Sequence, residues 1–175
     1  MLKKLTSRRA PSTRLGRALG VGAAALALAC TGLASAGSAS AEDRIPGFNL
    51  RNGSNGLCLE AYGEGTSPGT AVDQWGCNAH LNQLWSESHD AFGRQTLVNS
   101  YSGLCLDISG ANTNAGSRLI LWPWNNGWNQ EWQYTNGAFV NPTTNFAVDV
   151  PQWTNVWGTQ LDAWPYNGGA NQIWK

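Results

Sequence analysis

The feature that most constrains this chain is a four-residue motif, Asn-Gln-x-Trp, that occurs three times, at residues 82–85, 129–132 and 171–174. Each copy follows a short apolar segment that ends in an acid, at residues 57–60, 104–107 and 146–149. Both elements are offset by 47 positions between the first and second copies and by 42 positions between the second and third. The spacing inside a unit is therefore constant, and the difference in length lies in the connectors. A period of roughly 40 residues indicates a repeat architecture.

Three such units fit a closed ring better than a linear solenoid. A solenoid needs modified, polar repeats at its ends, whereas these copies are complete from first to last. Short apolar or alternating segments separated by Asn, Gly, Ser and Pro are typical of short strands and turns. In the first unit such segments lie at 48–50, 57–59, 71–75 and 83–85. Closing many short strands into a barrel removes their exposed edges, so we expect an all-β fold of about twelve short strands with pseudo-threefold symmetry.

Residues 1–41 have the composition of a secretory signal peptide. Residues 1–20 carry six bases and no acid, residues 21–33 are apolar and small, and Ala39-Ser40-Ala41 provides a small-residue cleavage site. We expect cleavage after Ala41 and export of the protein. A retained membrane helix is the weaker alternative, because the apolar stretch falls short of the roughly 20 residues needed to span a bilayer. Lipidation of Cys30, as in a bacterial lipoprotein, is a second alternative.

Removal of this leader changes the net charge. All eleven acids but only five of the eleven bases lie in residues 42–175, so the mature chain carries a charge of −6 (5 − 11). An acidic surface argues against nucleic acid and anionic lipid as partners. The remaining 134 residues (175 − 41) suffice for one domain with a modest core, and we expect a monomer.

Export permits disulfides, and Cys58 and Cys77 are the natural pair because they lie in the same unit, at either end of a short loop. Such a bond contributes roughly 3 kcal/mol on the chain-entropy model. Cys105 has Trp124 at the position of the second cysteine. We therefore expect Cys105 to be a buried thiol, with intermolecular pairing as the alternative.

The repeated pattern also resembles a known family. An apolar-Cys-Leu-acid segment, a Gly-Thr turn such as Gly69-Thr70, an aromatic residue such as Trp75, a Cys-Asn pair and Asn-Gln-x-Trp are together similar to the ricin-B-type β-trefoil lectin domain. Bacteria also use this domain as a carbohydrate-binding module. The similarity extends over about residues 48–174. It implies a β-trefoil domain within residues 42–175, with repeats at about 48–85, 95–132 and 137–174.

A sugar has one face of C–H bonds and a rim of hydroxyls, so its site needs an aromatic plate and hydrogen-bonding groups at the edge. The resemblance places the plates at Trp75, Trp122 and Trp164, and the hydroxyl acceptors at Glu60, Asp107 and Asp149. It places amides that both donate and accept at Asn78, Asn125 and Asn167 and at Asn82, Asn129 and Asn171. We expect the motif glutamines to border the pockets and to hold their turns through backbone hydrogen bonds: Gln83, Gln130 and Gln172. We assign the motif tryptophans to the hydrophobic core: Trp85, Trp132 and Trp174.

The three sites are not equal. The second matches the family best, whereas the first has Glu60 where Asp is usual. A second acid, Asp73 or Asp162, adds an acceptor to the first and third sites, but Ile120 at the same place in the second site adds none. The acids have a plainer interpretation as solvated surface charges. The site is favoured because the same apolar segment supplies an acid in every unit.

Catalysis is not expected. Glycosidases need two carboxyl groups about 5–10 Å apart, and the second unit has no such pair. His80 and His89 lie in one region without a nucleophile motif or ligand spacing, so we expect no catalytic residue, metal or cofactor.

The expected partner is a carbohydrate, and the resemblance allows galactose-type ligands, xylan or arabinose-containing polymers. The alternative is a trefoil that binds protein, such as a protease inhibitor with vestigial sugar sites. Four tryptophans outside the shared motif would serve either partner if exposed: Trp124, Trp128, Trp153 and Trp157.

Overall fold

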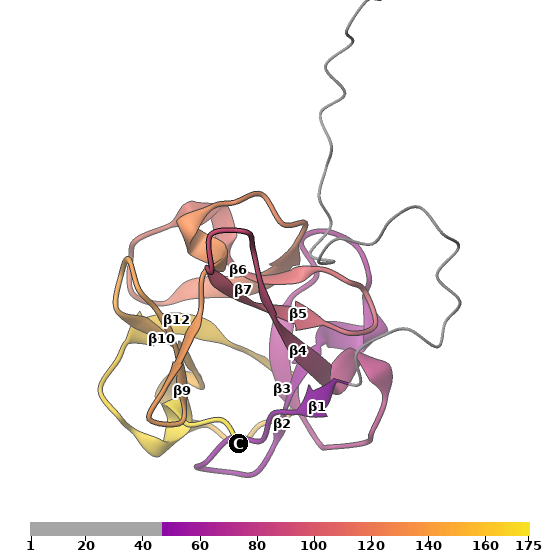
Figure 1. The fold of residues 1–175 in the computed structure, drawn as a ribbon. Coiled ribbons are helices and arrows are strands. Elements are labelled where there is room, and N and C mark those ends of the chain that lie inside the picture. The colour runs from indigo at the N-terminus through magenta and orange to yellow at the C-terminus, as the bar shows by residue number, and fades with distance from the viewer. Residues whose placement is uncertain (1–46) are drawn as a thin grey trace, which may run out of the picture.

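The computed structural model describes residues 47–175, which form a ring of short strands (Figure 1). The predicted signal peptide and Cys30 lie outside the described residues. Within residues 47–175, no helix is both long and apolar enough to cross a lipid bilayer.

Twelve strands occur in this described part, four to a unit. The first unit has β1 (Phe48–Asn49), β2 (Cys58–Ala61), β3 (Val72–Trp75) and β4 (Leu84–His89). The second has β5 (Gln95–Asn99), β6 (Cys105–Ile108), β7 (Ser117–Trp122) and β8 (Gln133–Thr135). The third has β9 (Ala138–Asn141), β10 (Phe146–Asp149), β11 (Thr159–Gln160) and β12 (Asp162–Pro165). Short 3-10 turns follow the acid strands or open the Asn-Gln-x-Trp motifs: η1 (Tyr62–Glu64), η2 (Leu81–Gln83), η3 (Ser109–Ala111), η4 (Trp128–Gln130), η5 (Pro151–Trp153) and η6 (Ala170–Gln172).

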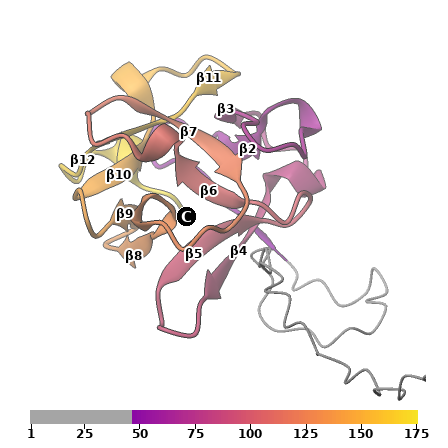
Figure 2. The same ribbon diagram turned by 90° about the horizontal axis from the view of Figure 1, so that it is seen from above.

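The strands pair antiparallel in two sheets. The large sheet has the order β1-β4-β5-β6-β7-β12-β10-β9-β8, and the small sheet has the order β11-β3-β2. Isolated bridges join the two sheets, between Arg51 and Cys58 and between Ala71 and Ile120. Seen from above, β11 of the third unit lies beside β3 of the first (Figure 2). The last unit is therefore hydrogen-bonded to the first, as ring closure requires.

The expected all-β trefoil with twelve short strands is confirmed, but the third unit is built differently. Its counterpart of β7 is interrupted at Leu161, because β11 pairs with β3 whereas β12 pairs with β7 and β10. Its last segment contributes only a bridge between Trp174 and Asn52. Gln83, expected to open a strand, ends η2 instead, and its side chain bonds to the turn before it.

The motif tryptophans form the centre of the hydrophobic core, as predicted. Trp85, Trp132 and Trp174 have no exposed surface. Each indole N–H donates a 3.0 Å hydrogen bond to a backbone carbonyl of its own unit. The acceptor is the residue directly before the acid: Leu59, Leu106 or Val148. Replacing one of these tryptophans by alanine would cost about 3–5 kcal/mol, because it leaves a cavity and an unpaired carbonyl.

Three buried asparagines that the sequence analysis did not single out connect the units. Asn52 Nδ2 donates to the Asn171 carbonyl at 2.9 Å, and Asn99 Nδ2 donates to the Asn82 carbonyl at 2.9 Å. Asn141 Nδ2 donates to the Trp128 carbonyl at 2.7 Å. Each asparagine thus bonds to the 3-10 turn of the preceding unit around the ring, and the first unit bonds to the third.

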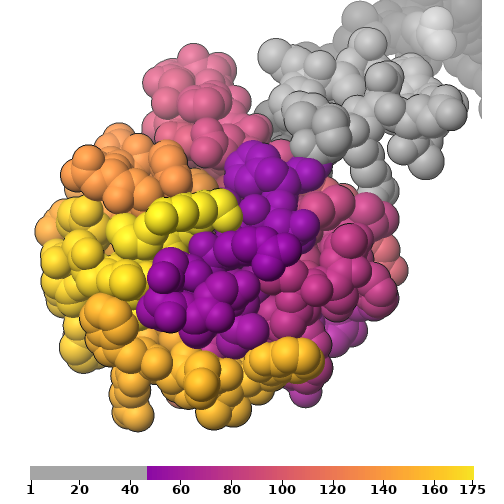
Figure 3. All heavy atoms as spheres, turned by 90° about the horizontal axis from the view of Figure 1, so that it is seen from below, coloured from indigo at the N-terminus to yellow at the C-terminus, as the bar shows by residue number. Residues whose placement is uncertain are grey.

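The two ends of the described chain meet on one face. Arg51 and Lys175 exchange backbone hydrogen bonds of 2.7 and 2.9 Å. In Figure 3, residues near the start of the domain lie directly against the C-terminal residues. This pairing closes the ring where no covalent connection exists.

The predicted disulfide is present, between Cys58 and Cys77, with a Cα–Cα distance of 5.1 Å. Cys105 is fully buried on β6, as expected of a small apolar side chain. None of the cysteines in residues 47–175 is free, however, so the prediction of a thiol at Cys105 is wrong. The prediction failed because it looked for a partner of Cys105 only within the same unit.

Candidate functional site

Strand pairing brings the predicted acids and plates together in each unit. Glu60 faces Asp73 across β2 and β3, Asp107 faces Ile120 across β6 and β7, and Asp149 faces Asp162 across β10 and β12. The plates lie two residues farther along β3, β7 and β12, and residues two apart point to the same face of a strand. Acid, opposing residue and indole therefore share one surface in every unit.

The motif glutamines hold the turns, as predicted. In each unit the glutamine Oε1 accepts a 2.9 Å bond from the backbone N–H of Asn78, Asn125 or Asn167. Its Nε2 donates to the carbonyl that follows the plate, on Gly76, Pro123 or Pro165, at 2.9–3.1 Å. Gln83 also donates to Glu60, and Gln172 donates to Asp149 at 2.9 Å. These amides are fully buried, so they fix both the turn and the carboxylate.

The six predicted asparagines fall into two groups with different positions. Asn82, Asn129 and Asn171 are buried, and the last two donate 2.8 Å bonds to Asp107 and Asp149. Asn78, Asn125 and Asn167 are exposed at the rims, and each side-chain oxygen accepts the backbone N–H two residues later. The buried group orients the acids, and the exposed group keeps its amide N–H groups free to face a ligand.

Burial raises the pKa of the pocket carboxyls in the second and third units. Loss of water raises the pKa of Asp107 and Asp149 to about 6, although the amide donors beside them act in the opposite direction. The pKa of Asp162 is also about 6, because of burial and the nearby charge of Asp149. At neutral pH these groups are mostly ionised and can accept hydrogen bonds.

The first unit behaves differently. Burial raises the pKa of Glu60, and burial together with the Glu60 charge raises that of Asp73 to about 8. Asp73 has no exposed surface, and neither of its oxygens has a partner on another residue. The first site therefore holds a protonated acid opposite Glu60 at neutral pH.

The plates differ in how open they are. Trp122 is 41% exposed and Trp164 is 44% exposed, whereas Trp75 is only partly exposed. Trp157, from the third unit, lies against Trp75 with ring centroids 5.4 Å apart and an interplanar angle of 54°. The first plate is therefore partly covered by an indole that has no counterpart at the other two sites.

The rims differ as well. At the first site a 2.8 Å hydrogen bond joins His80 Nδ1 and Glu64 Oε1. The second site has the small residues Ala111 and Gly127 at the equivalent positions, and the third has Trp153 and Gly169. A Cβ atom on Gly169 would lie 2.6 Å from Asn171 Oδ1 and 2.9 Å from Trp153 Cζ2, so this position has no room for a side chain.

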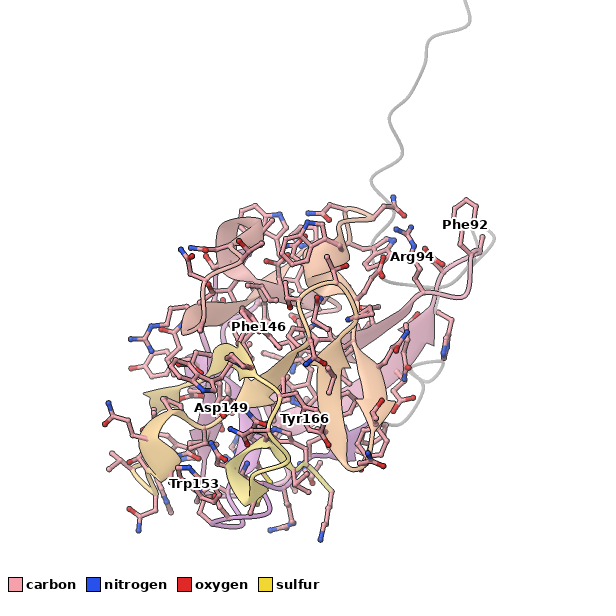
Figure 4. The ribbon with its side chains drawn as sticks, turned by 90° about the vertical axis from the view of Figure 1, so that its left-hand side faces the viewer. Phe92, Arg94, Phe146, Asp149, Trp153 and Tyr166 are labelled. Carbon is pink, nitrogen blue, oxygen red and sulfur yellow. A yellow bond between two sulfur atoms is a disulfide. The ribbon has the colours of Figure 1, made fainter. Side chains whose placement is uncertain are left out.

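The third unit has a defined pocket of about 340 Å³. Asp149 and Asp162, both almost fully buried, lie at its floor, and Trp164, Trp153 and Asn167 line its exposed side. Asp149 and Trp153 come from the same segment of the chain, and Trp153 lies at the outer edge of the unit (Figure 4). An indole face beside oriented carboxylates can contact both the C–H face and the hydroxyls of a sugar.

The family follows from a match over nearly the whole described chain. A family model for the ricin-type beta-trefoil lectin domain matches residues 47–174. The chain belongs to the ricin-type β-trefoil lectin family. No curated protein sequence matches the chain.

Solved structures share the ricin-type lectin fold. The designed threefold-symmetric protein ThreeFoil is 29% identical, with a TM-score of 0.68, over 73% of this chain and 94% of its own. An exo-β-1,3-galactanase from Clostridium thermocellum is 28% identical, with a TM-score of 0.70, over 76% of this chain but only 30% of the galactanase. The C-half of an earthworm R-type lectin, in complex with GalNAc, is 20% identical, with a TM-score of 0.63, over 75% of this chain and 97% of its own.

Two residues of this ricin-type lectin domain, Trp153 and Trp157, line sites to which the sequence analysis did not assign them. From the sequence they were predicted only to join an aromatic patch if exposed, and they are 56% and 57% exposed. The other two members do not join them: Trp124 packs against Arg94, whose guanidinium carbon lies 5.5 Å from the ring centroid, and Trp128 packs against the core. An alignment of the three units would have shown that Trp153 is equivalent to Ala111, and therefore lies at a pocket rim.

Proposed function

We propose that this protein is a secreted, non-catalytic lectin that binds sugars of a polysaccharide or cell-surface glycan through up to three shallow sites. The observation that carries the proposal is the third-unit pocket, where Trp164 is exposed beside Asp149. Two amides donate to Asp149, from Asn171 at 2.8 Å and from Gln172 at 2.9 Å, so the carboxylate is oriented before a ligand arrives.

The chemistry of this pocket suits a sugar. An indole face beneath the C–H face of a sugar contributes about 0.5–1.5 kcal/mol beyond area burial, by analogy with aromatic pairs. Hydrogen bonds to an ionised acceptor are roughly twice as strong as neutral ones. The second site, with Asp107, Trp122, Asn125 and Asn129, offers the same groups without a second acid, and the first offers Glu60 and a partly covered Trp75.

Galactose-type ligands come first among the candidates. Structures with the same fold contain GalNAc, 6′-sialyllactose or α-methyl-D-galactoside, and the matched galactanase acts on a β-1,3-galactan, as its name states. Xylan and arabinose-containing polymers follow. Sites of this size are individually weak, so a monomer with several of them would gain avidity on a polymer.

Binding should be measured across an array of glycans and plant or microbial polysaccharides, followed by calorimetry on the best ligand. We expect selective binding that Trp164→Ala and Asp149→Ala each weaken about tenfold or more, and that Asp107→Ala with Trp122→Ala weakens further. Phe92→Ala is the matched control, because Phe92 is 84% exposed at the tip of the β4–β5 hairpin (Figure 4). Absence of binding across the array would favour the protein-binding alternative.

Export requires its own test. It rests on the composition of residues 1–41 and on the disulfide, which forms in oxidising compartments. N-terminal sequencing of protein recovered from culture medium should begin at Glu42. Recovery in the membrane fraction, with lipid on Cys30, would instead establish a lipoprotein.

A further inference from the structure

One segment of the third unit contributes to two sites at once. Residues 151–158 run from η5 to β11, and Trp153 and Trp157 lie four positions apart on it. Trp153 lines the third pocket together with Trp164. Trp157 contacts Trp75 of the first site, across the junction between the last and first units.

The contact between Trp157 and the first site requires a glycine at position 76, which the other two units lack. A Cβ atom on Gly76 would lie 2.6 Å from Trp157 Cη2, so the indole rests directly on the glycine backbone. The other units have proline in place of Gly76, at Pro123 and Pro165. They also have a small or cyclic residue in place of Trp157, at Pro68 and Ala115. Large and small residues are thus paired at the first site alone.

The backbone at Gln152, just before Trp153, is held in an unfavourable conformation. The left-handed conformation of Trp153 itself recurs at the equivalent residues Glu64 and Ala111. Gln152 and Trp153 have φ angles of +55° and +57°, in the left-handed region. The first two units place a glycine before the rim residue, Gly63 and Gly110, but the third has Gln152. Two successive left-handed residues without a glycine cost energy, and such strain is concentrated at functional sites. The exposed indole of Trp153 contributes little to the core that would explain the strain.

The segment between the two indoles is fixed to the first unit. The fully buried Gln74 donates through Nε2 to the carbonyls of Thr154 and Val156, at 2.9 and 3.1 Å. Asn55 Nδ2 donates to Gln74 Oε1 at 2.8 Å and to the Thr154 carbonyl at 3.0 Å. At the place of Gln74 the other units have apolar residues, Leu121 and Ala163. This buried amide therefore anchors the backbone between the two indoles to the first unit.

We propose that Trp164, Trp153, Trp157 and Trp75 form one binding platform for an extended glycan chain, which passes from the third site to the first. The platform rests on the proposed lectin function and is continuous with two of its sites. The Cα atoms of Trp153 and Trp157 lie within about 14 Å of each other, the reach of four extended residues, so one extended glycan chain is long enough to reach both. The acids Asp149 and Glu60 accept hydroxyl groups at the two ends. An isolated terminal sugar would use only one end of this platform.

The test is the dependence of affinity on chain length. Calorimetry would compare galactose with β-1,3-galacto-oligosaccharides of increasing length, and xylose with xylo-oligosaccharides. The quantity of interest is the ratio of the affinity for the longest oligosaccharide to the affinity for the monosaccharide. Trp157→Ala and Trp153→Ala each introduce the residue that the second unit already has at the equivalent position, Ala115 and Ala111.

We expect the wild-type affinity to rise with chain length and each of these two variants to lower the ratio by about tenfold, the upper range for loss of one aromatic contact. Phe92→Ala should leave the ratio unchanged. The platform is refuted if Trp153→Ala and Trp157→Ala keep the wild-type ratio while Trp164→Ala still weakens binding, a result that leaves the lectin function intact. Failure of every sugar to bind the wild-type protein would refute the lectin function itself, and the platform with it.

Discussion

The buried carboxyl of Asp73 gives the sharpest quantitative prediction. It faces Glu60 across β2 and β3, has no exposed surface, and has no hydrogen-bond partner on another residue. Burial and the Glu60 charge raise its pKa from 3.8 to about 8. Between these two values, the folded protein keeps a proton that the unfolded chain has lost.

Folding therefore takes up this proton, and the free energy of unfolding falls as pH rises. One proton corresponds to about 1.4 kcal/mol per pH unit. From pH 4 to pH 7, Asp73 alone should lower the free energy of unfolding by about 4 kcal/mol, a large fraction of the roughly 5–15 kcal/mol typical of a domain. Its stabilising effect is fully present below pH 4 and is lost as pH approaches 8.

The Asp73→Asn variant removes the titrating group while keeping its shape. Urea unfolding followed by tryptophan fluorescence should give a free energy of unfolding whose fall between pH 6 and pH 8 is shallower than in the wild type, by about 1 kcal/mol per pH unit. Asp162→Asn is the matched control. Its pKa is about 6, so its effect on the slope should end near pH 6. An unchanged slope between pH 6 and pH 8 in Asp73→Asn would mean that the carboxyl is ionised in the folded protein, and the reasoning would be refuted.

Three further predictions concern the third site and the disulfide. Because the pKa of Asp149 is raised to about 6, sugar affinity should fall as pH drops through 6, the opposite direction to stability; calorimetry that shows equal affinity at pH 5 and pH 7 would exclude Asp149 as an ionised acceptor. Gly169→Ala should lower affinity at the third site at least tenfold, since the new Cβ would lie 2.9 Å from Trp153 and 2.6 Å from Asn171 Oδ1; binding equal to wild type would show that Trp153 can move without loss. Replacing Cys58 and Cys77 by alanine should lower the free energy of unfolding by roughly 3 kcal/mol in urea titrations, and a loss well under 1 kcal/mol would indicate that the hydrogen bonds of the ring already confine this loop.

Much of the architecture could be predicted because it repeats within the chain. A triplicated motif indicates the same local structure in every unit, so the structure predicted for one unit had to fit the sequences of all three. The core positions of Trp85, Trp132 and Trp174 and the turn bonds of Gln83, Gln130 and Gln172 followed from that constraint. The Cys58–Cys77 bond was predictable for a similar reason, since both cysteines lie in one unit.

The differences among the three sites could not be predicted in this way, because they arise where one unit touches another. Trp157 belongs to the third unit by sequence but packs on Gly76 of the first, and Gln74 of the first unit holds the carbonyl of Thr154 in the third. Ring closure brings these residues together, and the spacing of residues within a repeat does not predict such contacts between units.

The sequence by itself therefore determined the trefoil and its core, and it predicted the acid and the indole that lie on one surface in each unit, because these depend on contacts within a repeat. Only the tertiary structure decided that Asp73 is sealed from water, that Trp75 is partly covered, and that Trp153 borders an open pocket. Those properties depend on which surfaces of neighbouring units meet, and that contact is made only in the closed ring of all three units.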